Sequence, residues 1–173
     1  MPGGLEAIEL RERVRSVHRS FPSGVAVVTT ATDGTPYGLA VNAFSSVSMD
    51  PPIVLVCVNT TARTHDPLYQ GAHLGINFLA HDQVPIARRF ATSGGNKFSG
   101  VTWHTGEDGV PLLDGASAYL VMEIQQRLAV ATHTIFVGEV TAASAQRRAP
   151  LVYYAGVFFD GTELDLASLD DSG

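Results

Sequence analysis

The chain is poor in cysteine and has no long apolar run, and both absences narrow the class of protein. Among its 173 residues the single cysteine, Cys57, lies inside the apolar run from Ile53 to Val58. One cysteine cannot form an internal disulfide, so a reducing compartment is the simpler expectation. This apolar run is the longest one and is far too short to span a bilayer, and the segment from Met1 to Gly4 lacks the features of a signal peptide. We therefore expect a cytoplasmic protein without a membrane partner.

Positive charge is also scarce. The formal net charge is -6 and the isoelectric point is near 5.4, which argues against a surface built to hold a phosphate backbone. We expect no nucleic acid partner. Hydrophobic residues make up 45% of the chain, enough for one core, and no linker divides it. We therefore expect a single domain over residues 1–173.

The common motifs of metal sites and hydrolytic or nucleotide-binding sites are missing too. The six histidines do not show the spacing to Cys, Asp or Glu that a metal site needs, so we expect no catalytic metal. No G-x-S-x-G elbow, Walker loop or G-x-G-x-x-G fingerprint is present. Serine hydrolase, P-loop and Rossmann interpretations therefore have no local support.

The apolar pattern predicts mostly strands after one helix. Leu10, Val14, Val17 and Phe21 recur at helical spacing, which indicates an amphipathic helix over about residues 5–20. A strand-rich barrel is expected over about 24–159, followed by an acidic tail at 160–173. The expected strands cover residues 25–30, 53–58, 74–79, 116–130, 132–143 and 151–159, and the expected short helices lie near 66–70 and 84–90.

Three small polar clusters follow or interrupt these strands: Ala40 to Ser48, Asn59 to Thr64 and Gly94 to Gly100. Such segments are rich in hydroxyl, amide and backbone donors, which can surround a phosphate and a planar polar ring. Taken alone, each cluster is more often an ordinary loop.

Three longer stretches, read in order, add a family resemblance. They are FPSGVAVVTT from Phe21, YGLAVNAFSSVSMDPPIVLVCVN from Tyr37, and HTIFVGEV from His133 together with PLVYYAGVFF from Pro150. In this combination the chain resembles the flavin reductase-like family of FMN-binding split barrels, over roughly residues 14–159. The resemblance implies a mainly β fold, a Greek-key split β-barrel with a few short helices, and a homodimer with flavin sites near its interface.

The resemblance also implies which residues contact the flavin. The segment along the isoalloxazine ring supplies backbone amides and small hydroxyls, the loop after the next strand supplies phosphate contacts, and a later loop closes over the ligand. The implied flavin contacts are Ala40, Val41, Asn42, Ala43, Ser45, Ser46 and Ser48 for the ring, Asn59, Thr60, Thr61, Arg63 and Thr64 for the phosphate, and Lys97 and Phe98 in the closing loop.

On the nicotinamide side the resemblance implies His133, with Tyr153 and Tyr154 shaping the same pocket. Hydride transfer from nicotinamide C4 to flavin N5 needs stacked rings and no general base, so no catalytic side chain is expected. The pair before the histidine, Ala131-Thr132, departs from the acidic or glycine pair frequent in relatives. No arginine cluster is assigned to a 2′-phosphate, which favours NADH and leaves NADPH as the alternative.

The implied activity is an NAD(P)H:flavin oxidoreductase that reduces free FMN or FAD and supplies a flavin-dependent monooxygenase. Two alternatives remain at this point. One is a split-barrel oxidoreductase that retains a flavin or deazaflavin and acts on a small organic substrate. The other is a flavin-binding protein without catalysis.

Overall fold

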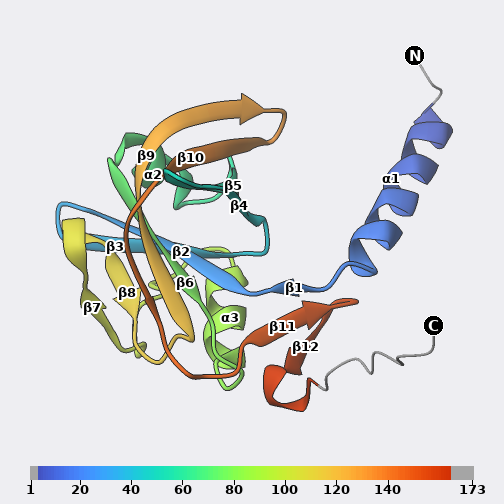
Figure 1. Cartoon of the computed structure of the whole chain (residues 1–173). Helices are drawn as coiled ribbons and strands as arrows, with labels where there is room; N and C mark the ends of the chain where they lie inside the picture. Colours follow the sequence, from blue (N-terminus) through green and yellow to red (C-terminus); the bar gives the residue numbers. More distant parts are fainter. Residues whose placement is uncertain (1–3, 165–173) are drawn as a thin grey trace.

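The computed structural model describes residues 4–164, and most of its regular structure is β (Figure 1). Within these residues no helix is long and apolar enough to cross a bilayer. In chain order the elements are α1 (Gly4–Arg19), β1 (Ser23–Gly24), β2 (Ala26–Thr32), β3 (Thr35–Val41), β4 (Phe44–Met49), β5 (Pro52–Asn59), α2 (His65–Gln70), β6 (His73–Phe78), α3 (Val84–Ala91), β7 (Trp103–Thr105), η1 (Glu107–Gly109), β8 (Pro111–Leu113), β9 (Ala118–Val130), β10 (His133–Ala145), β11 (Leu151–Tyr154), β12 (Val157–Asp160) and η2 (Gly161–Glu163).

The main sheet has seven antiparallel strands in the order β3-β2-β6-β9-β10-β5-β4. Its two edge strands, β3 and β4, follow each other in the chain and are joined only by Asn42 and Ala43. A flat sheet of seven strands would place its edges about 29 Å apart, whereas the link from Val41 to Phe44 reaches about 11 Å at most. The sheet must therefore curl until the end of β3 lies near the start of β4, while these two edge strands are not hydrogen-bonded to each other, which matches the expected split barrel.

Strand β2 lies between two apolar layers. Val28 belongs to the core inside the curled sheet, with Leu74 and Phe136, whereas Val27 faces a second core formed with Phe90 on α3. Both valines are fully buried. This explains the continuous apolar sequence of β2, because a strand covered on both faces needs no polar alternation.

The last expected strand, 151–159, is divided in the structure. Ala155 and Gly156 take positive φ angles of 53° and 88°, so the chain turns there and forms the β11–β12 hairpin, which pairs with β1 in a separate three-stranded sheet. The expected acidic tail also begins too early, because Asp160 ends β12 and η2 follows. Residues 165–173 of that expected tail lie outside the described part of the chain.

The expected N-terminal helix is present as α1, but its apolar stripe does not pack on the barrel. Figure 1 shows α1 extending away from the main sheet, next to β1 and the β11–β12 hairpin. Leu10, Val14, Val17 and Phe21 are 62%, 43%, 68% and 77% exposed. The stripe predicted from the sequence is therefore an open apolar face in a single chain.

We expect Gly138→Ala to destabilise the fold by about 2 kcal/mol or more. Gly138 lies at a bulge between β9 and β10, and an added Cβ would lie 1.9 Å from the Glu123 carbonyl oxygen. The matched control is Gly24→Ala, whose Cβ meets nothing within 4 Å. Urea denaturation should show a lower midpoint for Gly138→Ala alone, and equal midpoints for both variants would contradict this account of the bulge.

Candidate functional site

Three hollows lie along β3, and the first is the cationic pocket, of about 430 Å³. It is bounded by the first half of β3, the loop after β5 and the loop between α3 and β7. Its lining consists of Thr35, Pro36, Tyr37, Gly38, Arg63, Thr64, Gly95, Asn96, Lys97, Phe98, Ser99 and Trp103.

This pocket concentrates positive charge without a counter-charge. Arg63 and Lys97 both line it, and none of its lining residues is Asp or Glu, although the whole chain carries a net charge of -6. Burial, and then the neighbouring Arg63, lower the pKa of Lys97 below its ordinary value. A bound anion would relieve this repulsion, so the pocket is suited to a phosphate.

Backbone contacts hold the two cations in place. Lys97 Nζ donates a hydrogen bond to the Phe90 carbonyl oxygen at 3.0 Å, and Arg63 Nη1 donates to the Gly95 carbonyl oxygen at 3.5 Å. These carbonyl partners leave further N–H donors on both side chains for a ligand. The loops of residues 59–64 and 94–100, which are separate in sequence, therefore meet across one pocket.

The threonine hydroxyls of the loop after β5 form hydrogen bonds within the chain. Asn59 Oδ1 accepts hydrogen bonds from the Thr61 backbone N–H at 2.9 Å and from the Thr61 hydroxyl at 2.8 Å. The Thr60 hydroxyl donates to the Thr132 carbonyl oxygen, and the hydroxyl of Thr64, which is 3% exposed, donates to Gly38. Arg63 is exposed and is the side chain of this loop that brings charge to the pocket.

Aromatic rings form the wall behind the cations. Phe90 and Phe98 meet edge to face with ring centroids 5.1 Å apart, and Phe98 and Trp103 do so at 5.5 Å. Gly38 lets β3 approach this wall, because a Cβ there would lie 2.6 Å from the Phe90 ring. The pocket thus combines an apolar wall with two cations.

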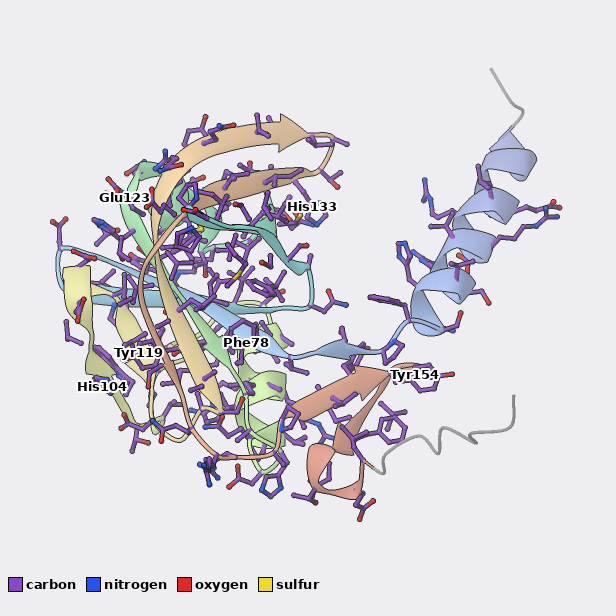
Figure 2. The ribbon with its side chains drawn as sticks, in the orientation of Figure 1. Phe78, His104, Tyr119, Glu123, His133 and Tyr154 are labelled. Carbon is purple, nitrogen blue, oxygen red and sulfur yellow. The ribbon has the colours of Figure 1, made fainter. Side chains whose placement is uncertain are left out.

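The second hollow, the strand-end pocket, has a volume of about 410 Å³ and lies where β3 leads into β4. It brings together Ala40, Val41, Asn42 and Ala43 with Asn59 and His133. His133 Nδ1 lies 2.9 Å from the Thr132 hydroxyl oxygen, and the imidazole is exposed (Figure 2). Residues implied for the flavin ring and for the nicotinamide therefore share one hollow.

Cys57, which lies in the apolar run from Ile53 to Val58, also lines the strand-end pocket. The thiol is half-buried on the outer face of β5, and burial raises its pKa above the ordinary value. It is therefore a neutral, weakly polar group on the pocket wall and not an activated nucleophile.

The third hollow, the Arg88 pocket, has a volume of about 470 Å³ and lies between the end of β3, α3 and the β11–β12 hairpin. Tyr153 lines it together with Ala40, Val41 and Asn42. Figure 2 shows Tyr154 beside the end of α1, apart from His133. Within one chain, the structure does not bring these two tyrosines together with His133.

The three serines of β4 lie outside these three hollows. The Ser45 hydroxyl donates to the Ser46 carbonyl oxygen at 3.2 Å, and Ser48 Oγ accepts from the Asp50 backbone N–H at 3.2 Å. Ser45 and Ser46 are exposed on the outer edge of the sheet, so in one chain only solvent faces them.

Sequence reasoning missed several lining residues, chiefly Tyr37, Arg88 and Trp103. Lys97 is the only lysine and Trp103 the only tryptophan of the chain. These single occurrences were the features of the sequence that could have drawn attention to the cationic pocket. Among the residues that the structure describes, no three His, Cys, Asp or Glu side chains gather to hold a metal ion. The linings of the three hollows along β3 combine cations, aromatic rings and small side chains.

Comparison with known proteins finds the flavin reductase-like resemblance again, over most of the chain. The family model described as flavin reductase like domain matches residues 18–162. The reductase component of a 4-nitrophenol 4-monooxygenase/4-nitrocatechol 2-monooxygenase from Rhodococcus opacus is 44% identical over 144 residues, which cover 83% of this chain and 77% of that protein.

Two further relatives extend this comparison. The reductase component of a flavin-dependent trigonelline monooxygenase from Acinetobacter baylyi is 34% identical over 90% of this chain, which spans only 50% of that protein. The solved NADH:FAD oxidoreductase of Streptomyces globisporus C-1027 superposes with a TM-score of 0.81 at 37% identity, covering 86% of this chain and 91% of that one.

We expect Arg63→Ala to raise the pKa of Lys97, because the variant removes the cation that disfavours the protonated lysine. Since Lys97 is the only lysine, selective ¹³C labelling of lysine gives one side-chain signal whose pH titration can be followed by NMR. Arg147→Ala, outside the pocket lining, is the control and should leave the titration unchanged. An unchanged titration in Arg63→Ala would show that the two cations do not face each other.

Proposed function

Because the chain belongs to the family of flavin reductase like domains, we propose that it reduces free FMN or FAD with NADH and releases the reduced flavin to a flavin-dependent monooxygenase. NADPH is the alternative reductant. One observation carries the proposal: a pocket with two cations and no carboxylate lies along the same strand as the pocket that holds His133. An elongated ligand with a phosphate at one end and a ring at the other fits that arrangement.

We place the flavin along β3. Tyr37 and Gly38 line the cationic pocket, and Leu39 to Ala43 line the strand-end pocket, so the two hollows follow each other along one strand. The phosphate end then lies between Arg63 and Lys97, and the ring lies against Ala40 to Ala43. Small side chains there let backbone amides reach the ring's polar edge.

The chemistry needs orientation more than proton transfer. The nicotinamide supplies a hydride from C4 to flavin N5 when the two rings are stacked. Amide donors near the ring stabilise the negative charge of reduced flavin more than they stabilise the oxidised ring. His133 holds the nicotinamide at the edge of the same pocket and abstracts no proton.

We also propose that the protein acts as a homodimer in the cytoplasm. The open apolar face of α1 and the exposed Val47 and Met49 on β4, at 56% and 82% exposure, are apolar surfaces that a second copy of the chain would cover. The β4 serines and the tyrosines Tyr153 and Tyr154 lie apart from His133 in one chain. Their roles at the flavin and the nicotinamide therefore require the second copy.

Turnover of free flavin tests the function. Purified protein is mixed without oxygen with NADH or NADPH and excess FMN or FAD, in all four pairs, and the loss of flavin absorbance is followed. Multiple turnovers are expected with at least one pair. A protein that stays yellow through purification and turns over no free flavin would instead be an enzyme with a retained flavin, or a flavin-binding protein.

His133→Ala should raise the KM for NADH about tenfold, because the nicotinamide loses a hydrogen-bonding partner, with a smaller effect on the flavin Kd. The matched control is His104→Ala, at an exposed histidine remote from the strand-end pocket (Figure 2). Steady-state kinetics and flavin titration measure the two effects, and equal losses for NADH and flavin would remove His133 from the nicotinamide site.

Arg63→Ala should weaken FMN binding about tenfold, the effect of losing one charge-assisted contact to phosphate. Quenching of flavin fluorescence measures the Kd, with Arg147→Ala as the control. An FMN Kd equal to that of the unaltered protein would exclude Arg63 from the phosphate site.

A further inference from the structure

The size and lining of the cationic pocket bear on which flavin it takes. Resting on the proposed function, we propose that the substrate is FAD in preference to FMN, with the two phosphates of its ADP half between Arg63 and Lys97 and its adenine against Trp103 and Tyr37.

The pocket extends well beyond its two cations. It has a volume of about 430 Å³, and its lining includes Tyr37 on β3 and Trp103 on β7 besides Arg63 and Lys97. A single terminal phosphate needs only the part between the cations. The rings of Tyr37 and Trp103 therefore belong to the same hollow as the two cations.

Both of these rings remain partly open. Trp103 packs edge to face on the buried Phe98 at 5.5 Å, yet it is only half-buried and lines the pocket. Tyr37 is half-buried on the β3 side of the same hollow. Aromatic faces of this kind are the surfaces on which a purine base stacks.

The charge also suits two phosphates. The two cations come from loops that are 34 positions apart in sequence (63 to 97), and no carboxylate in the lining neutralises either. A pyrophosphate presents two negative groups side by side, so each cation can hold one. Asn96 and Ser99 add polar atoms beside Lys97.

The first test is a titration with ADP, which contains the proposed second half of FAD and no flavin. Because Trp103 is the only tryptophan, the intrinsic tryptophan emission of the protein reports on this pocket alone. A saturable emission change is expected with ADP, with a weaker response to AMP, and protein already saturated with FAD should show no further change when ADP is added. No saturable change with ADP would overturn the proposal.

The second test compares FAD with FMN. We expect the unaltered protein to bind FAD about tenfold more tightly than FMN, and Trp103→Ala to remove about tenfold of the FAD affinity while FMN affinity stays within about twofold. Trp103→Phe keeps a stacking surface and should retain most of the preference. Phe159→Ala, at an exposed ring outside the pocket lining, is the control.

The outcomes separate this inference from the proposed function. Equal Kd values for FAD and FMN, or equal losses for both in Trp103→Ala, would overturn the FAD assignment and show that Trp103 serves only the core. If the protein also turns over free flavin in that case, the proposed function stands. A protein that reduces neither flavin contradicts the function itself, whatever the ADP titration shows.

Discussion

The two-residue link between β3 and β4 is the constraint on which the site depends. Because Asn42 and Ala43 join the two edge strands of a seven-stranded sheet, the sheet must curl until the end of β3 lies near the start of β4. The Cys57 backbone N–H donates to the Ala43 carbonyl oxygen at 3.1 Å and fixes the junction to β5. The curl brings the end of β3 to the start of β10, so His133 and Ala40 to Ala43 share one pocket.

The same curl places the cationic pocket. The loop after β5 returns to β3, where Thr64 donates to Gly38, and this leaves Arg63 opposite Lys97. Burial first, and the neighbouring Arg63 second, lower the pKa of Lys97. In the function we propose, the phosphate of the flavin supplies the negative charge that these two cations lack.

The sequence predicted those parts that rest on local pattern. The period of α1 and the apolar run of β2 are visible without the fold, and the ordered motifs indicated the barrel. Long-range contacts were not predictable in the same way. Nothing in the sequence near Thr64 shows that its hydroxyl donates a hydrogen bond to the Gly38 carbonyl oxygen. The short β7 strand, which brings Trp103 to the pocket, has too few residues to show a periodic pattern. The apolar stripe of α1 predicted the helix but not what covers it.

The claim that Arg63 and Lys97 hold the flavin by its phosphate is tested most directly by comparing FMN with riboflavin, which has the same ring and no phosphate. The account predicts that the protein binds FMN at least about tenfold more tightly than riboflavin, and that the difference shrinks as salt concentration rises, because the contact is electrostatic. Equal affinity for the two flavins at low salt would contradict it.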